Sequence, residues 1–315
     1  MKVVRIGVEE FSEFLQGVDD PLIQDPETYL RWLDKLGSLP VFWCSGGVGL
    51  GYLGLKEGGR LLGALKLLRV RVFFYEGGAW RGVKERGEVR EVFLSEWKPE
   101  NLSFLLTKAA DLFSGYGLSV FGVSEWKPEA WSLLERCGLS PYARSVLIGW
   151  ETGKPIPKEG NPRVSIRPAS RSSLGELRRI QRESWGFFIP PNPKYHRVFI
   201  AYLDGQAVGS IYLNPLTGNI DYGVHVAAKF QRRRIGAALL RFAQQYFKKH
   251  GFRQMYVIRV LRALGKVNEA DRTALSFYLN CGGRILREYR GFRVKVRRRR
   301  LRIPPLKEFI NQLPE

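Results

Sequence analysis

The chain has few of the side chains that bind metals or form cross-links, with only three cysteines and three histidines in 315 residues. Cys44, Cys137 and Cys281 are far apart and form neither a Cys-x-x-Cys pair nor a Cys/His cluster. Zinc sites and disulfide frameworks need closely patterned cysteines, so the sequence predicts no metal site and a reducing compartment.

Long hydrophobic runs are also missing. The most apolar stretch, residues 48–70, is interrupted by glycines and charged residues every few positions. A membrane-spanning helix needs about 20 consecutive apolar residues, so no membrane partner is expected. The first residues, MKVVRIGVEEFSEF, lack the apolar core of a secretory signal. With 44% hydrophobic and 13% aromatic residues, the chain is expected to fold with real cores and to reside in the cytoplasm.

Acidic residues are scarce in only one half of the chain. Residues 1–160 contain 20 Lys/Arg and 21 Asp/Glu, whereas residues 161–315 contain 31 and 9. The net charges of −1 and +22 predict two units with different surfaces. Between them, residues 149–164 include three prolines and three glycines, a composition typical of a linker. We therefore expect domains at 1–150 and 164–303, a linker at 151–163 and a C-terminal tail at 304–315.

The second half alternates strand and helix patterns. Strands are expected at 164–170, 198–203, 206–215, 219–227, 254–260 and from 283 onward, and helices at 173–186, 235–251 and 268–283. Asp204-Gly205 is a strong hairpin signal between two of the strands. The order strand, helix, three strands, helix, strand, helix, strand predicts an α/β fold (an α+β mixed sheet) with helices on both faces.

A run of three arginines, in FQRRRIGAALL at residues 230–240, falls between the strand at 219–227 and the following helix. A helix N-terminus presents unpaired N–H groups and the positive end of the helix dipole, so it can bind phosphate. Adjacent arginines would add charge-assisted contacts to such an anion. The alternative is that the arginines are simply solvated at the start of a helix and bind nothing, which is more common for a run of charged residues.

This stretch resembles the acetyl-CoA signature of the GNAT N-acetyltransferases, Arg/Gln-x-x-Gly-x-Gly/Ala, with Gln231 first and Gly236 last. Downstream, DRTALSFYLNCGG resembles the second family signature, in which Asp271 stands for an Asn and Tyr278 for a Tyr. Arg234 occupies the position of the usual first glycine, so a side chain stands where the backbone would approach phosphates. The resemblance implies acetyl-CoA as the cofactor and the following contact residues: Val224, Val226, Gln231, Arg232, Arg233, Arg234, Ile235, Gly236, Ala237 and Asp271.

The resemblance also implies direct transfer of an acetyl group from a thioester to an amine, which needs an acid and a base. Tyr278 is the expected acid for the leaving thiolate, the alternative being a packed helix aromatic. Asp221 and His225, on the strand before the arginines, are the candidates for the base, and each could instead be structural. Their side chains share a face of the strand unless a β-bulge intervenes, and family members often have one there.

The first half looks like a diverged copy of the second. Its turn, EWKPENLS, has no glycine and contains a proline, which removes one backbone donor. Leu134 stands at the tyrosine position, so this copy is expected to be non-catalytic. The alternative is a chance match between amphipathic helices. Four residues match at an offset of 134, Leu105, Ala109, Phe113 and Gly117 on Leu239, Ala243, Phe247 and Gly251, and Cys137-Gly138 match Cys281-Gly282 at an offset of 144.

Two functions of different classes follow. The first is a tandem-domain, acetyl-CoA-dependent N-acetyltransferase that acts on a primary amine of unidentified nature. The second is a nucleic-acid-binding protein that uses a basic GNAT-like scaffold without acetyl transfer. The run RGFRVKVRRRRLRIPP, residues 290–305, favours an acidic macromolecular partner, because coenzyme A is too small to use so much basic surface. No recognised nucleic-acid-binding motif accompanies the run.

Overall fold

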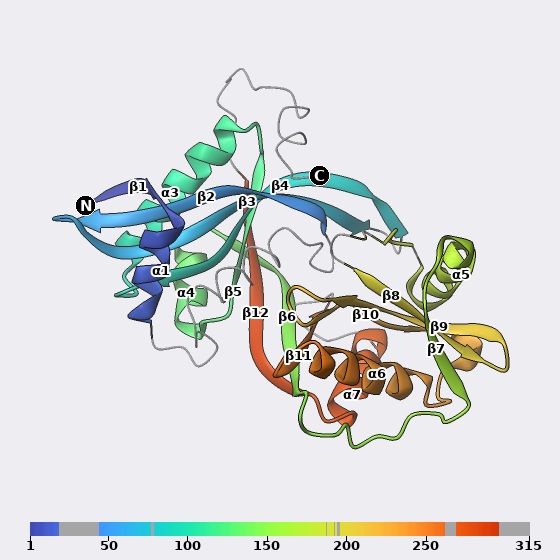
Figure 1. The fold of residues 1–315 in the computed structure, drawn as a ribbon. Helices are drawn as coiled ribbons and strands as arrows, with labels where there is room; N and C mark the ends of the chain where they lie inside the picture. Colours follow the sequence, from blue (N-terminus) through green and yellow to red (C-terminus); the bar gives the residue numbers. More distant parts are fainter. Residues whose placement is uncertain are drawn as a thin grey trace. The chain divides into compact units, whose positions relative to one another are not determined.

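The computed structural model describes residues 1–18, 44–76, 79–186, 188–191, 193, 196–261 and 269–295. The chain forms two compact units (Figure 1). Unit 1 comprises Met1–Arg144 and Tyr289–Glu315, and unit 2 comprises Ser145–Glu288. Each boundary falls inside a strand, the first in β6 (Ser140–Glu151) and the second in β12 (Arg284–Lys295).

Unit 1 is a mixed sheet in the order β1-β2-β3-β4-β5-β12. The first four strands pair antiparallel, β4 and β5 are parallel, and β12 pairs antiparallel with β5. The elements are β1 (Lys2–Ile6), α1 (Val8–Gln16), β2 (Cys44–Glu57), β3 (Arg60–Glu76), β4 (Ala79–Leu94), α3 (Pro99–Gly115), β5 (Val120–Glu125) and α4 (Pro128–Arg136).

Unit 2 repeats this arrangement, with its strands in the order β7-β8-β9-β10-β11-β6. Again the first four strands pair antiparallel and the next pair, β10 and β11, is parallel. The elements are β7 (Val164–Pro168), η1 (Arg171–Ser173), α5 (Leu174–Trp185), β8 (Arg197–Leu203), β9 (Gln206–Asn214), β10 (Asn219–Val226), η2 (Ala228–Phe230), α6 (Ile235–Lys249), β11 (Gln254–Leu261) and α7 (Glu269–Asn280).

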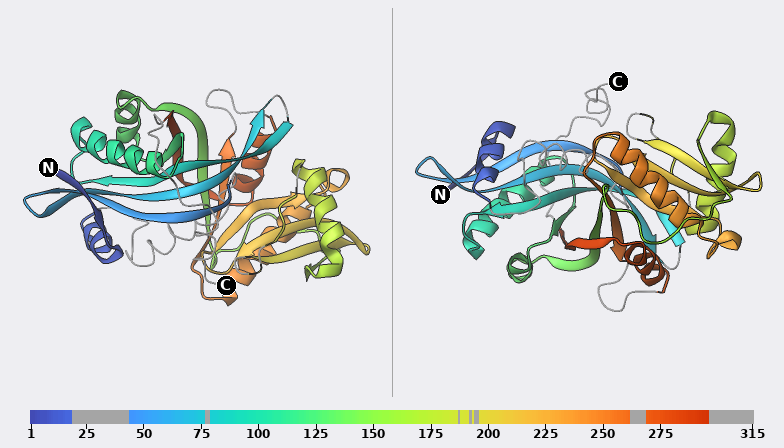
Figure 2. Two further views of the ribbon diagram at one scale, coloured as in Figure 1. Left: turned by 90° about the horizontal axis from the view of Figure 1, so that it is seen from above. Right: turned by 60° about the horizontal axis from the view of Figure 1, so that its bottom comes forward.

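Helices cover both faces of each sheet. Side chains alternate between the two faces along a strand, and here both faces carry apolar side chains that pack against helices. In unit 2, Ile211 and Leu213 pack into the cluster that includes α6 and α7, whereas Tyr212 between them packs under α5. In unit 1, Val92 lies in the cluster beneath α3 and α4, and Phe93 packs against α1. The left view of Figure 2 shows α3 and α4 on one side of the strands of unit 1 and α1 on the other.

The residues that match between the two halves occupy the same structural places. Leu105, Ala109 and Phe113 are buried on α3, and their counterparts Leu239, Ala243 and Phe247 are buried on α6. Each of these helices is followed by a glycine with positive φ, and so is each of α4 and α7. The predicted mixed sheet with helices on both faces is confirmed, and the second half shows the predicted order of elements and the Asp204-Gly205 hairpin. The glycines are Gly117 and Gly251 (φ 71° and 80°) and Gly138 and Gly282 (φ 85° and 80°).

The division into compact units is not sequential. Residues 290–295 of β12 pair with β5 of unit 1, although the sequence favoured a final strand in the second domain. Residues 145–151 of β6 belong in turn to unit 2. The domain boundaries at 150 and 164 stay a prediction. Among the helices of the described residues, none is long and apolar enough to cross a membrane.

Candidate active site

A β-bulge interrupts β10 in unit 2. Asp221 pairs with Tyr212 of β9, but the next paired residue is Val224, opposite Ile211. Tyr222 and Gly223, which lie between them, both have positive φ, 64° and 82°. A non-glycine residue rarely adopts this conformation, and it often marks a functional site. The bulge redirects the backbone at the point where β10 approaches the arginines.

Within the described residues, strands β10 and β11 pair only where β10 begins. In the described residues their ladder consists of the single pair Asn219↔Tyr256. On the other side of β10, His225 and Val226 keep their partners in β9. The N–H of Ala227 also points to β9, where Val208 O accepts it at 2.9 Å. Because backbone groups alternate in direction along a strand, those of Val224 and Val226 point toward β11.

Tyr278 of α7 lies beside the bulge. Its Oη accepts a hydrogen bond from the N–H of Val224 at 2.9 Å. The ring is buried and packs edge-on against Trp150 and Phe277, with centroid distances of 5.9 and 5.0 Å. Burial raises the pKa of Tyr278 above its usual value of 10, although the Arg259 charge and the Val224 N–H act in the opposite direction. The phenol therefore keeps its proton at neutral pH.

Asp271 was expected to contact the cofactor, but the structure places it in the interior. It is fully buried near the start of α7, and its Oδ1 lies 3.7 Å from Nη2 of Arg259 on β11. Arg259 is itself buried, and its Nη1 lies 3.7 Å from the position that a Cβ on Gly223 would take. This arginine, which the sequence did not single out, thus brings a buried cation to the bulge.

The arginine turn, residues 228–234, leads from β10 into α6. Arg232 and Arg234 both adopt the left-handed conformation, with φ of 61° and 58°. Position 234 thus has the backbone conformation that its usual glycine adopts readily, at a strain of about 1 to 3 kcal/mol for arginine. The Arg234 guanidinium lies 3.7 Å from Glu159, and both side chains are exposed.

The other two arginines of the turn are exposed with Gln231. The Arg233 guanidinium lies 5.3 Å from the centre of the Phe230 ring, and Phe230 is buried. The turn therefore carries four exposed cations, the three arginines and Lys229, on a backbone that is anchored by one buried aromatic. This arrangement can bind an anionic group from solvent.

Helix α6 begins at the turn with unused backbone donors. Its first helical hydrogen bond runs from Ala238 N–H to Arg234 O at 3.1 Å, so the amides of Ile235, Gly236 and Ala237 have no acceptor within the helix. The side chain of the N-cap residue, Arg234, makes no capping hydrogen bond. A Cβ on Gly236 would lie 2.9 Å from the ring of Phe277, so glycine permits the close packing of α6 on α7.

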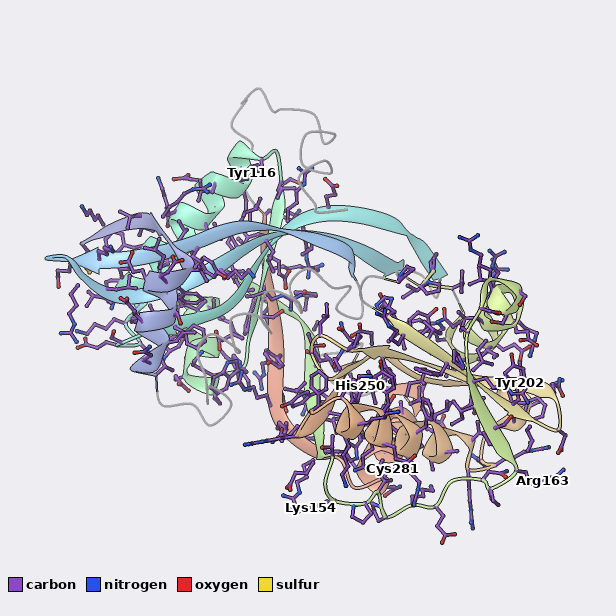
Figure 3. All side chains as sticks on the ribbon, viewed as in Figure 1. Tyr116, Lys154, Arg163, Tyr202, His250 and Cys281 are labelled. Atoms are coloured by element: carbon purple, nitrogen blue, oxygen red, sulfur yellow. The ribbon has the colours of Figure 1, made fainter. Side chains whose placement is uncertain are left out.

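The segment expected to be a linker, residues 151–163, instead packs along α6. Asn161 holds the arginine turn, since its Nδ2 donates to Arg233 O at 3.0 Å and its N–H donates to Arg234 O at 3.3 Å. At the other end Gln244 donates to the carbonyl of Lys154, which Figure 3 labels with Arg163. The Pro- and Gly-rich composition of the segment gave no signal for these contacts.

Asp221, one candidate base, is enclosed by polar side chains. Its Oδ2 accepts from Asn214 Nδ2 at 3.1 Å and lies 3.2 Å from His196 Nε2, and its Oδ1 accepts from Asn219. Its cross-strand partner, Tyr212, packs under α5, so Asp221 faces α5 and not Tyr278. The carboxylate is thus held in a buried hydrogen-bond network.

His225, the other candidate, also faces α5. Its Nδ1 lies 3.2 Å from Ser184 Oγ, and its ring packs on Trp185 with a centroid distance of 4.5 Å. Its Nε2 is buried and has no hydrogen-bond partner among the described residues. Burial, with a smaller effect of the Arg259 charge, lowers the pKa of His225 to about 3. The imidazole is neutral at physiological pH and is a weak base in this state.

This burial predicts a pH-dependent stability. Between pH 6.5 and about 3 the unfolded state binds a proton at His225 that the folded state does not, so stability falls as the pH falls through this window. From pH 7.5 to 5 the loss attributable to His225 should be about 2 kcal/mol. Urea unfolding at the two pH values measures it, and His225→Gln should reduce the difference by that amount.

His250 provides the matched control. It is exposed at the end of α6 and is labelled in Figure 3. The substitution His250→Gln should leave the pH dependence as in the wild type. An unchanged pH dependence in His225→Gln would mean that His225 is solvated and protonates in the folded protein.

The predictions of a basic C-terminal run with a tail, and of no metal site, remain predictions. The basic run reaches residue 295 in the described part of the chain, and Arg297–Arg300 lie outside it, as does the tail at 304–315. No group of three or more potential metal ligands occurs within the described residues.

Comparisons with known proteins identify the fold. A family model described as the acetyltransferase (GNAT) domain matches residues 194–282. A search of curated proteins found no significant match. Among solved structures, a GCN5-related N-acetyltransferase from Sphaerobacter thermophilus is 14% identical with a TM-score of 0.64, over 94% of this chain and 95% of that one.

Two other structures extend the likeness. A tandem GNAT protein from the clavulanic acid biosynthesis pathway is 11% identical with a TM-score of 0.60, over 95% of this chain and 99% of its own. A putative acetyltransferase from Pyrococcus horikoshii is 11% identical with a TM-score of 0.52, over 94% and 89% of the two chains. The chain therefore contains a GNAT domain at residues 194–282 and has, over nearly its whole length, the fold of the GCN5-related N-acetyltransferases.

Proposed function

We propose that the protein is a cytoplasmic, acetyl-CoA-dependent N-acetyltransferase that acts on a primary amine through unit 2. The family and the fold support N-acetyltransferase activity in general. The observation that carries the specific proposal is the 2.9 Å hydrogen bond between Val224 N–H and Tyr278 Oη. It brings a backbone donor and a protonated phenol together beside the opening of β10 from β11.

The arginine turn is suited to the pyrophosphate of coenzyme A. The amides of Ile235, Gly236 and Ala237 supply donors at the positive end of the α6 dipole. Arg232 and Arg233 add positive charge in solvent beside them. Asn161 fixes the two carbonyls of the turn, so the donors stay oriented toward the anion.

The bulge is suited to the thioester. Acetyl-CoA, when bound, supplies the activated acetyl group. The exposed edge of β10 at Val224 and Val226 offers backbone groups to its extended arm. In place of its bond to Tyr278 Oη, the Val224 N–H can donate to the acetyl carbonyl oxygen as negative charge develops there. Tyr278 holds the proton that the departing sulfur takes up.

The acceptor amine would approach from the α5 side. Asp221 and His225 line that face, opposite the face on which Tyr278 packs. Because the β10–β11 ladder has a single described pair, an amine on the α5 side can meet the thioester through the opening between these strands. Neither Asp221, which is engaged in hydrogen bonds, nor His225, which is a weak base, needs to touch the reacting nitrogen, and proton removal through water is compatible with both.

The proposal predicts that acetyl-CoA binds once per chain through the arginine turn. Replacing Arg232 and Arg233 together by Ala should weaken acetyl-CoA binding about 10- to 100-fold, since two charge-assisted but solvent-screened contacts are lost. Isothermal titration calorimetry at fixed ionic strength measures the change.

A double change of Lys248 and Lys249 to Ala is the control. These lysines are exposed in the last turn of α6, and their removal alters the net charge equally. Acetyl-CoA affinity should change less than threefold in this control. If the Arg232/Arg233 change spares acetyl-CoA binding and abolishes RNA or DNA binding, the turn belongs to a nucleic-acid surface and the enzyme proposal fails.

A further inference from the structure

One strand position carries opposite charges in the two units. Glu125 ends β5, and Arg259 lies near the end of β11. The offset of 134 residues that relates α3 to α6 also relates these two residues, and it relates the buried Val123 to the buried Val257. Both Glu125 and Arg259 are buried on the central parallel strand, where ionised side chains are rare.

Each of these residues lies next to a bulge on the neighbouring strand. In unit 1 the register of β4 shifts between Arg90 and Val92, because Arg90 pairs with Lys66 and Val92 pairs with Leu65. In unit 2 the register of β10 shifts between Asp221 and Val224. Val92 and Val224 are thus the first paired residues after corresponding bulges.

In unit 1 the backbone after the bulge is occupied by side chains of the unit itself. Glu125 Oε2 accepts the N–H of Val92 at 2.9 Å. Lys127 Nζ donates to Val92 O at 2.9 Å and lies 3.2 Å from Glu125 Oε1. The parallel ladder of β4 and β5 has four pairs, from Gly87↔Phe121 to Arg90↔Ser124, so these strands remain together up to the ion pair.

In unit 2 the corresponding amide is held by a phenol and not by a carboxylate. A guanidinium has five N–H donors and no acceptor, so Arg259 cannot take the N–H of Val224 as Glu125 takes that of Val92. The Val224 N–H bonds instead to Tyr278 Oη, an oxygen that can also donate. Asp271, 3.7 Å from Arg259, balances the buried charge from the far side.

We propose that the residue at this strand position decides whether a unit can hold an acyl group. Glu125 closes the site of unit 1 by capturing its bulge amide. Arg259 leaves the Val224 amide of unit 2 to the neutral Tyr278 Oη, which a carbonyl oxygen can displace, and is a positioning residue for the acyl group. This proposal rests on the proposed function for its ligand, an acyl thioester, and on the two bulges for its geometry.

A pair of neutral variants separates the role of the acceptor atom from that of the charge. Arg259→Gln introduces a carbonyl oxygen on a side chain as long as that of Glu125, which reaches the matched amide of Val92, whereas Arg259→Met has a similar length and no strong acceptor. Calorimetry with acetyl-CoA and with free CoA measures both ligands on each variant. We expect Arg259→Gln to bind acetyl-CoA about tenfold more weakly than Arg259→Met, with equal affinities for free CoA, which has no acetyl carbonyl.

Equal acetyl-CoA affinities of the two variants would overturn the proposal, as would weaker binding by Arg259→Met. Hydrogen exchange at the Val224 amide, without ligand, supplies a second readout. Exchange should be slower in Arg259→Gln than in Arg259→Met, and equal exchange rates would contradict capture of the amide. If the wild type binds neither CoA nor acetyl-CoA, the proposed function fails, and the exchange result still decides the role of position 259.

Discussion

Tyr278→Phe should lower kcat about 10²- to 10⁴-fold while changing acetyl-CoA affinity by less than threefold. The substitution removes only the hydroxyl and keeps the ring that packs between Trp150 and Phe277. A proton donor to the leaving sulfur acts in the transition state, so its loss is expected in kcat. Steady-state kinetics on the acceptor amine, with calorimetry for the cofactor, separate the two quantities.

Tyr246→Phe is the matched control for this change. Tyr246 is a half-buried phenol on α6 that stacks on His250 with a centroid distance of 4.1 Å. Its hydroxyl is not part of the site, so kcat should stay within a factor of two. A wild-type kcat in Tyr278→Phe would assign Tyr278 to core packing.

Glu125→Ala should destabilise the protein by about 3 to 5 kcal/mol. The carboxylate accepts the N–H groups of Val92, Trp126 and Lys127 at 2.9 to 3.0 Å. Its removal leaves these three N–H donors without their acceptor and the buried Lys127 ammonium without its counter-ion, with Val92 O as its remaining acceptor. Urea unfolding at neutral pH measures the loss, followed by a probe that reports on unit 1.

Glu135→Ala serves as the comparison, because Glu135 is exposed on α4 of the same unit. Its effect should stay within about 0.5 kcal/mol. If Glu125→Ala destabilises by less than 1 kcal/mol, water replaces the carboxylate readily. The ion pair would then not close the backbone of unit 1.

Local patterns were enough to predict the order of helices and strands from β7 to α7 and to nominate a candidate site. The hairpin at Asp204-Gly205, the start of α6 and the place of Tyr278 each depend on residues close together in sequence. The expectation of a bulge on β10 rested on the family resemblance and not on the pattern of residues. The left-handed backbone at Arg234 explains how an arginine can stand at the position of a glycine.

The contacts that the sequence did not reveal join segments far apart in the chain. Asn161 and the arginine turn are separated by about 70 residues, and nothing in the Pro- and Gly-rich segment indicated a cap. The sequence likewise gave no indication that His196 Nε2 lies 3.2 Å from Asp221 Oδ2. Arg259 and Glu125 could have been found, because the offset of 134 that aligns the helices places one on the other. The sequence feature that could have singled them out is that the two aligned positions carry side chains of opposite charge.

The most direct test of the account is the stoichiometry of acetyl-CoA binding to the full-length chain, measured by calorimetry on the wild type and on the Arg232/Arg233 double variant. We expect one site per chain, weakened in the double variant, because α6 begins at the arginine turn, whereas α3 of unit 1 begins at Pro99, which has no N–H, and Glu125 holds the bulge amide of unit 1. Two sites per chain would show that the Glu125–Lys127 pair does not close unit 1. No binding to the wild type would contradict the assignment of unit 2 as an acetyl-CoA-dependent enzyme.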